Sequence, residues 1–412
     1  MKIRMVTEMT KIQKLIEAGV HIPNPESVFI ADDVDLSGIS GNNVVIHAGC
    51  KIFGASTLIL QGANLGFEAP VTIEDCQIGP DVKLNGGFFR GVVFLEKASV
   101  GSGAHVREGT ILEEQASAAH TVGLKQTILF PFVTLGSLIN FCDCFMSGGT
   151  SRKDHSEVGS SFIHFNYTPN QDKATPSLIG DVPRGVMLNQ RPIFLGGHGG
   201  IIGPCILEFG TVTAAGTICR KDELRPDRLI ASGLKRDINI PYIPSAFSNV
   251  KKISGANILY VANLLALNQW YEHVRTAFFS SMFPETLYAG LKQKLAMAID
   301  ERLKQLKAYC MNFESKSGSS EPSLNVKLML ELKGRWDELE NYLREAKKIR
   351  LDAQLSDPFL ESLEKTIQTE GKNYIAVIKG LPDKSSESGT RWLQSIVDRI
   401  ILDCSGIIPS LK

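Results

Sequence analysis

The chain has 412 residues, with 44 Lys and Arg against 44 Asp and Glu, so its formal net charge is zero. This length allows two or three domains, and the balanced charge excludes a global field that would steer the protein to nucleic acid or an anionic membrane. Eight cysteines are too sparse for a disulfide scaffold. The sequence shows neither a signal-peptide apolar run nor about 20 consecutive apolar residues that would span a bilayer. We therefore expect a cytoplasmic protein without nucleic-acid or membrane partners.

Residues 1–25 are expected to form a short helix and a turn. Ile12, Leu15 and Ile16 share one face of an amphipathic helix, and Gly19 follows as a stop signal. A turn with two prolines then leads into a different kind of sequence.

Residues 26–222 carry a six-residue repeat of small aliphatic side chains, as at Val100, Val106, Leu112 and Ala118. A six-residue unit places one such side chain inward on each face, so about 18 residues make a three-sided coil, and roughly nine coils would stack. An ordinary β-sandwich is the alternative, but it would alternate with period two and turn every 8–12 residues or so. The repeat therefore predicts a parallel β-solenoid.

Beyond the repeat, a change of period predicts a second structural unit. Residues 223–255 contain three prolines and are expected to form an extended linker. Residues 256–412 repeat apolar side chains at steps of three and four, which predicts an all-α helical bundle domain with a break at 315–323. Its faces rich in Lys and Glu are typical of solvated surface, and it carries no chemical motif.

Three motifs within the solenoid combine cations with an Asn-Tyr pair. They are Arg107-Glu108-Gly109, Val122-Gly123-Leu124-Lys125, and Ile163-His164-Phe165-Asn166-Tyr167 followed by Lys173 and Ile179-Gly180-Asp181. Together with the repeat, they resemble the acetyltransferase half of the bifunctional family that makes UDP-N-acetylglucosamine, which combines glucosamine-1-phosphate acetyltransferase with N-acetylglucosamine-1-phosphate uridylyltransferase (pyrophosphorylase). By eye, the resemblance covers roughly residues 20–219.

The resemblance implies a left-handed parallel β-helix, the known exception to right-handed crossovers between parallel strands. It also implies a homotrimer with ligands in the clefts between subunits. The ligands would be acetyl-CoA or another acyl-CoA and a sugar phosphate or nucleotide sugar. Arg107, Lys125 and Lys173 would contact phosphates, and Asn166 and Tyr167 would lie near the acyl or sugar group.

Two departures from the family pattern bear on activity. The family's Gly-His-Leu-(Ser/Thr)-Tyr catalytic segment aligns with residues 136–140, so Ser137 occupies the position of the general base and Asn140 that of the Tyr. Unaided Ser is not a base at neutral pH, and general-base catalysis typically contributes about 10²–10⁴-fold. A nucleotide-binding domain with a Gly-rich phosphate loop is not visible either, so we expect no pyrophosphorylase activity.

An insertion at residues 146–155, MSGGTSRKDH, offers a replacement site. In that hypothesis His155 is the base, oriented by Asp154 or another acid, while Arg152 and Lys153 clamp phosphate beside freely exposed glycine amides. The alternative is an ordinary polar surface loop, and the sequence leaves both open.

Three further features have simpler explanations. His164 lies two residues before Asn166 and could approach the same substrate, but we favour a hydrogen-bonded residue of the solenoid wall. The glycine cluster at residues 196–200 is explained by turn geometry. Cys142-Asp143-Cys144 lacks the spacing and second ligand pair of a structural zinc site, so we expect no metal.

The sequence therefore predicts an acyl-CoA-dependent sugar N- or O-acyltransferase. The alternative hypothesis is a non-catalytic nucleotide-sugar sensor or trimeric scaffold of the same fold, which lost its base at Ser137 and recruits a partner through its helices. The identity of the sugar, of the acyl group and of any partner is not specified by these motifs.

Overall fold

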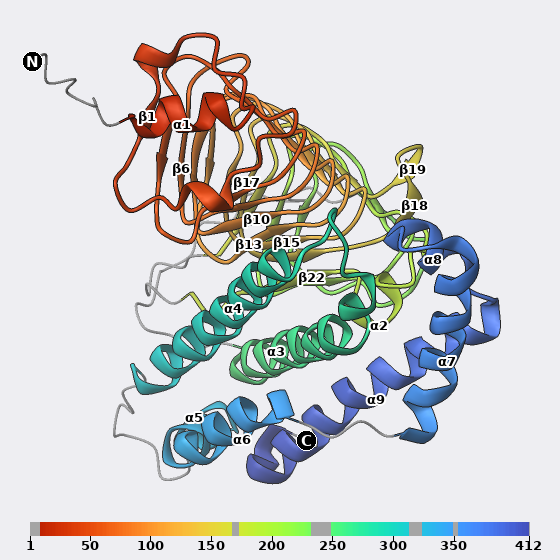
Figure 1. The fold of residues 1–412 in the computed structure, drawn as a ribbon. Helices are drawn as coiled ribbons and strands as arrows, with labels where there is room; N and C mark the ends of the chain where they lie inside the picture. Colours follow the sequence, from red (N-terminus) through yellow and green to blue (C-terminus); the bar gives the residue numbers. More distant parts are fainter. Residues whose placement is uncertain (1–8, 167–172, 232–248, 313–323, 349–352, 412) are drawn as a thin grey trace, which may run out of the picture.

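The computed structural model describes residues 9–166, 173–231, 249–312, 324–348 and 353–411. These residues form a parallel β-solenoid with a helical region packed along one side of it (Figure 1). A short helix, α1 (Lys11–Glu17), precedes the first coils, with Leu15 as its buried residue. The prediction of a left-handed parallel β-helix followed by an all-α region is confirmed.

Each coil contributes one short strand to each of three faces. The inward residues form columns through the stack, such as Ile46, Leu65 and Leu84, which are all fully buried and pair in parallel register. At a corner, Gly62 adopts a φ of 74°, and a Cβ there would lie 2.1 Å from Oδ1 of Asp81 on the next coil. The corner therefore requires glycine for both its conformation and its space.

Faces 1 and 2 are each built from strands of successive coils. The strands of face 1 are β1 (Phe29–Ile30), β3 (Lys51–Phe53), β6 (Val71–Glu74), β9 (Gly87–Arg90), β12 (Ala104–Val106), β21 (Ile163–Phe165), β24 (Gly200–Ile202) and β27 (Ile218–Cys219). The strands of face 2 are β2 (Val45–Ile46), β5 (Asn64–Leu65), β8 (Lys83–Leu84), β11 (Ser99–Val100), β14 (Ser117–Ala118), β16 (Thr134–Leu135), β20 (Glu157–Val158), β23 (Phe194–Leu195), β26 (Val212–Thr213) and β28 (Leu229–Ile230).

Face 3 completes the triangle. Its strands are β4 (Leu58–Ile59), β7 (Gln77–Ile78), β10 (Val92–Phe94), β13 (Thr110–Leu112), β22 (Ser177–Ile179) and β25 (Ile206–Leu207). Two longer strands, β15 (Gly123–Leu129) and β17 (Asn140–Met146), bend from face 1 into face 3. A hairpin, β18 (Gly149–Ser151) and β19 (Asp154–His155), is inserted before β20.

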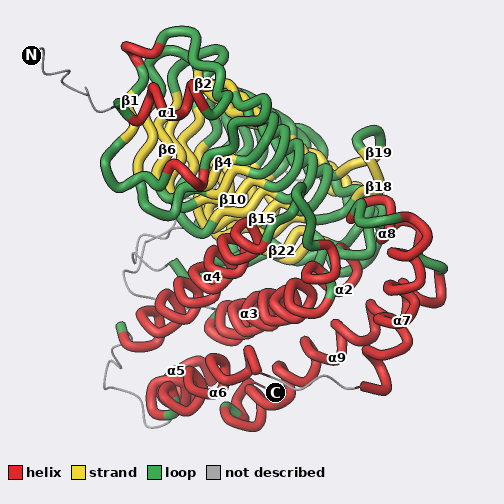
Figure 2. The backbone as a smooth tube through the Cα atoms, viewed as in Figure 1, coloured by secondary structure: helices red, strands yellow, loops and turns green. Residues whose placement is uncertain are grey.

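Face 3 differs from the other two because helices cover it (Figure 2). Most of its strands are buried on both sides, and Val92, Val93 and Phe94 of β10 are all fully buried. Such continuous apolar runs are typical of strands that are buried on both faces. Helices α3 (Val250–His273) and α4 (Glu285–Met311) supply the outer layer.

The remaining helices pack beyond α3 and α4 (Figure 1). They are α5 (Leu324–Gly334), α6 (Trp336–Glu345), α7 (Ala353–Glu370), α8 (Tyr374–Gly380) and α9 (Asp383–Ile407). Gly371 separates α7 from α8 with a φ of 75°, the left-handed conformation that commonly ends a helix. No helix among the described residues is both long and apolar enough to cross a membrane.

The observed elements shift some expected boundaries. Helix α3 begins at Val250, ahead of the expected boundary at residue 256. Strand β28 falls within the expected linker and continues face 2 by pairing with β26. Residues 232–248 of that linker lie outside the described part of the chain.

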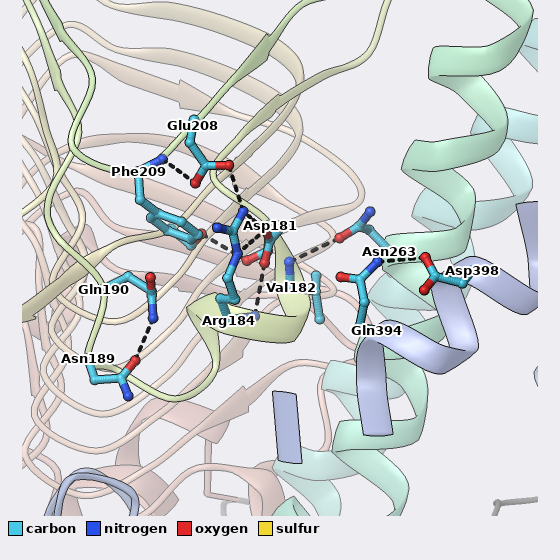
Figure 3. A network of polar contacts seen from close by, with 11 residues as sticks. Asp181, Val182, Arg184, Asn189, Gln190, Glu208, Phe209, Asn263, Gln394 and Asp398 are labelled. Atoms are coloured by element: carbon cyan, nitrogen blue, oxygen red, sulfur yellow. Dashed lines mark hydrogen bonds and ion pairs between the residues drawn. The ribbon is translucent and has the colours of Figure 1, made fainter. Parts of the chain in front are cut away.

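A polar junction at the late coils attaches the helical region (Figure 3). Arg184 of the short helix α2 (Val182–Gly185) bridges Asp181 and Glu208, and its guanidinium lies 4.9 Å from the centre of the Phe209 ring. The N–H of Val182 donates to Oδ1 of Asn263 in α3 at 3.0 Å. This junction joins α2 at the late coils to the middle of α3.

Candidate functional site

Stacking of the coils places Arg107 and Lys125 side by side on face 1. The Arg107 N–H donates to the Leu124 carbonyl at 2.8 Å, so Arg107 lies one coil below Lys125. Their neighbours Val106 and Leu124 are buried, and because side chains alternate along a strand, both cations point outward. Adjacent coils are about 4.8 Å apart, a spacing at which two cations can hold one phosphate.

Beside these cations, the neighbouring column of stacked residues on face 1 has a gap at Gly123. His105, Gly123 and Asn140 are paired across three successive coils, and both His105 and Asn140 are exposed. A Cβ at Gly123 would meet only the Asn140 amide within 4 Å, at 3.7 Å, so glycine leaves room between the two polar side chains. His105 stacks on Phe88 with ring centres 5.0 Å apart, which orients its imidazole.

Ser137, aligned with the family's general base, lies at the corner that leads from face 2 into face 1. Its N–H donates to Oγ of Ser160 at 3.2 Å. One coil earlier, the same corner carries His120, whose carbonyl accepts from the N–H of Leu138 at 3.2 Å. The His120 side chain is exposed and lies on the same coil as Lys125. Motif comparison missed His120, although the phase of the coil repeat would have placed it beside Ser137.

Asn166 lies at the opposite edge of face 1, where α4 meets the solenoid. Its Nδ2 donates to Oδ2 of Asp143 at 3.1 Å, and Nη2 of Arg302 in α4 donates to Oδ1 of the same carboxylate at 2.6 Å. Burial raises the pKa of the Asp143 carboxyl above its usual range, and Arg302 and Asn166 oppose this shift. Lys173 lies nearby, since its carbonyl accepts from Nη1 of Arg302 at 3.2 Å. Tyr167 lies outside the described residues.

The predicted base His155 lies away from these groups within one protomer. It belongs to β19 and faces Glu157 of face 2, with His155 Nε2 3.6 Å from Glu157 Oε2. Its Nδ1 is buried, and no hydrogen-bond partner for it is described. The acid beside His155 is therefore Glu157, because Asp154 instead accepts a hydrogen bond from Thr150 at 2.7 Å.

Arg152 anchors the hairpin to the solenoid. Its Nη1 donates to the carbonyls of Gln115 and Phe132 at 3.0 and 2.9 Å, and it lies 2.9 Å from Oγ1 of Thr134. Lys153 is exposed at the tip, where its N–H donates to Oγ of Ser151. The hairpin thus presents Lys153 to solvent, while the Arg152 guanidinium is hydrogen-bonded to the corner between faces 3 and 2.

His164 is a wall residue, as we favoured from the sequence. It is 3% exposed, its Nε2 lies 2.8 Å from Oγ of Ser177, and burial lowers its pKa to about 4. The imidazole is therefore neutral near pH 7 and points into the solenoid. Burial also raises the pKa of the Cys142 and Cys144 thiols. Among the described residues, no group of three or more His, Cys, Asp or Glu could hold a metal ion.

Comparison with known proteins identifies relatives of the solenoid, although no family model matches the chain. Bifunctional protein GlmU of Thermotoga sp. (strain RQ2) is 27% identical over 214 residues, which cover 52% of this chain and 42% of the relative. The GlmU of Trichlorobacter lovleyi is 26% identical over 227 residues (55% and 44%), and that of Fervidobacterium nodosum is 27% identical over 237 residues (58% and 46%). The chain thus spans less than half the length of these relatives.

Proposed function

Because about half of this chain is homologous to bifunctional GlmU proteins, we propose that it transfers an acyl group from acyl-CoA to a sugar phosphate or nucleotide sugar. We place the site on face 1 and propose acetyl-CoA as the acyl donor. The protein is proposed to act in the cytoplasm. The observation that carries this proposal is the adjacency of Arg107 and Lys125 beside the gap at Gly123. Paired cations recognise phosphate, and the gap leaves room for the group that reacts.

The proposed step is attack of a sugar amine or hydroxyl on the thioester carbonyl. The new N–C or O–C bond forms as the C–S bond breaks, a base on the protein takes the proton of the nucleophile, and CoA leaves as the thiol. His155 is the base proposed from the sequence. His120 is the second candidate, since it lies on the coil of Lys125 and one coil from Ser137.

The site is proposed to lie between protomers of a homotrimer. Exposed apolar side chains occur on both faces that the helices leave open, with Ile163 and Ile202 on face 1 and Phe194 and Val212 on face 2. Association of face 1 with face 2 of a neighbour would be heterologous, and a rotation of about 120° between successive subunits would close such contacts into a three-membered ring. A trimer would bury both surfaces and bring the neighbour's face 2, with its His155, towards face 1.

The alternative function is a non-catalytic nucleotide-sugar sensor or scaffold, favoured by one observation. Ser137 stands where the family has its base, and its side chain offers no group that accepts a proton near pH 7. In that case the cations of face 1 bind ligand without turnover.

Turnover by the purified full-length chain distinguishes these functions. With acetyl-CoA and glucosamine 1-phosphate, we expect sugar-dependent release of free thiol. Replacing the true base, by His155→Ala or His120→Ala, should lower kcat by about 10²–10⁴-fold. The variants Arg107→Met and Lys125→Met should raise KM for the sugar phosphate, and Lys83→Met on face 2 serves as the matched control.

If no thiol is released, ligand binding tests the sensor alternative. UDP-N-acetylglucosamine should then still raise the melting temperature through binding linkage, and Lys125→Met should abolish the shift, as the sensor alternative predicts. Absence of both turnover and any thermal shift with uridine nucleotides or sugar phosphates would contradict the proposed ligand class.

A further inference from the structure

We propose that Arg302 of helix α4 is a positioning residue through which the helical region sets the placement of Asn166 and Lys173 at the edge of face 1. This inference rests on the proposed function, because it assigns Arg302 a role in the recognition of the phosphorylated sugar. It concerns a contact between residues far apart in the sequence, one on the solenoid and one on a helix that covers face 3.

On one side of this contact, the Asp143 carboxylate holds the Asn166 side chain. The Asp143 carboxylate lies between two donors, with Nδ2 of Asn166 on one oxygen and Nη2 of Arg302 on the other. The Arg302 side chain is 2% exposed and that of Asp143 is 5% exposed, so water does not compete for either charge. Asp143 adopts a φ of 61°, a left-handed conformation, at the point where β17 bends from face 1 into face 3.

The other side of the contact holds the chain where it returns at Lys173. Nη1 of Arg302 donates to the Lys173 carbonyl at 3.2 Å, and Nδ2 of Asn257 in α3 donates to the next carbonyl, that of Ala174, at 2.9 Å. One guanidinium therefore contacts Lys173 directly and Asn166 through the Asp143 carboxylate. Asn166 and Lys173 are the two residues of the Asn-Tyr motif proposed to contact substrate that lie within the described part of the chain.

To bond to Asp143 and the Lys173 carbonyl together, the side chain needs the planar, branched geometry of a guanidinium. The planar guanidinium presents donors in two directions at fixed geometry, whereas an ammonium ion is a compact point charge. Arg302→Lys would keep the charge opposite Asp143 but could not span both Asp143 and the Lys173 carbonyl. Positioning should therefore be lost while much of the packing is kept.

The chain contains a matched control for a general loosening of the helical region. Arg275, which follows α3, pairs with Glu114 at a different corner, and the two side chains are 1% and 8% exposed. Both arginine–carboxylate pairs are buried and both join the helical region to the solenoid. Of the two arginines, Arg302 is the one that bonds to the Lys173 carbonyl and shares the Asp143 carboxylate with Asn166. Arg275→Lys therefore imposes a similar packing cost away from face 1.

The test measures Kd for UDP-N-acetylglucosamine and KM for glucosamine 1-phosphate and for acetyl-CoA in full-length variants. Arg302→Lys should raise Kd or KM for the phosphorylated sugar on the order of 10-fold or more, because small misplacements of binding groups are costly. The double variant Asp143→Asn with Arg302→Met should do the same without leaving an unpaired buried charge. Arg275→Lys should leave the sugar constants unchanged, although it lowers the melting temperature similarly.

Hydrogen exchange supplies a readout that does not depend on ligand. In Arg302→Lys, backbone exchange at residues 163–166 and 173–175 should rise relative to wild type and to Arg275→Lys. Unchanged exchange there, unchanged sugar affinity in a folded Arg302 variant, or an equal loss of affinity in Arg275→Lys would each overturn the inference. If the wild-type chain binds no phosphorylated sugar, but Arg302→Lys raises exchange selectively at residues 163–166 and 173–175, the proposed function is contradicted. Arg302 then only organises the backbone at those residues.

Discussion

Burial shifts the pKa of several ionisable side chains in this protein. Glu113 shows this at the corner between faces 3 and 2, where the Tyr271 hydroxyl donates to its Oε1 at 2.5 Å. Burial, reinforced by the neighbouring Glu114, raises the pKa of the Glu113 carboxyl to about 7, although Arg275 and Tyr271 oppose the shift. The helical region therefore packs on a carboxyl group that is substantially protonated near neutral pH.

This shift predicts that stability falls as the pH rises. The folded state binds more protons than the unfolded state between pH 4.5, the ordinary pKa, and about pH 7, so the free energy of unfolding decreases across that window. Glu113→Gln keeps an acceptor for Tyr271 and removes the titration. We expect the variant to match wild type near pH 5 and to be more stable at pH 8, by at most about 3 kcal/mol.

Denaturant unfolding at both pH values checks this prediction. Glu108→Gln is the control, since that carboxylate pairs with Arg90 in a more exposed position and its pKa is lowered. Equal stability of Glu113→Gln and wild type at pH 8 would contradict the prediction, because ionisation of Glu113 would then cost the folded protein no free energy.

Single residues also mark the limit of sequence analysis. Arg107 and Lys125 could be placed together in advance, because they occupy the same phase of consecutive coils. His120 occupies the phase of Ser137 and could have been found in the same way, but motif comparison directed attention to His155. The partner of Asp143 could not be foreseen, since Arg302 lies 159 residues away on a helix without a recognisable motif.

Among the elements, the β18–β19 hairpin uses Arg152 in contacts with the solenoid, and the phosphate role expected from the sequence stays a prediction. A Gly-rich loop with two cations suggested phosphate binding, but the guanidinium of Arg152 contacts two solenoid carbonyls and a hydroxyl. These contacts give the Gln115 and Phe132 carbonyls a charged donor, and the Phe132 carbonyl also accepts from the Thr134 hydroxyl at 3.0 Å.

We therefore predict that Arg152→Gln frees the hairpin without weakening ligand binding. Loss of charge-assisted hydrogen bonds at an exposed site should destabilise the hairpin by about 1 kcal/mol, which corresponds to a several-fold rise in hydrogen exchange at residues 149–155. Lys153→Gln, at the exposed tip, should leave exchange unchanged. If Arg152→Gln lowered sugar affinity while the hairpin stayed protected, the original hypothesis of a phosphate clamp would be right.

The elements themselves were more predictable than their mutual packing. The six-residue period required three-sided coils, and the 3.6-residue period required helices, because each pattern buries one continuous apolar surface. Apolar side chains continue at helical spacing across residues 359–378, but the structure divides this stretch between α7 and α8 at Gly371, where local backbone preference overrides the apolar period. Which face the helices would cover was not visible from either period.

At the scale of the molecule, the helical region leaves faces 1 and 2 uncovered, and both carry exposed apolar residues. Ile202 is 39% exposed on face 1 and Phe194 is 42% exposed on face 2. If these faces join in a trimer, Ile202→Glu or Phe194→Glu should yield monomers of unchanged secondary structure, because a desolvated carboxylate without a partner is strongly unfavourable.

Light scattering coupled to size exclusion measures this outcome directly. Leu402→Glu provides the control, since Leu402 is 64% exposed on α9, a helix that packs against α3 and α7. A wild-type chain that remains monomeric at high micromolar concentration would rule out the trimer, and the site would then consist of face 1 alone.

The central claim is that face 1 recognises a phosphorylated sugar, and hydrogen exchange of the wild-type chain with and without saturating UDP-N-acetylglucosamine tests it most directly. The account predicts protection at residues 105–107, 123–126, 140–143 and 163–166, with little change in α5 to α9. Protection confined to the helical region or to the β18–β19 hairpin would contradict it.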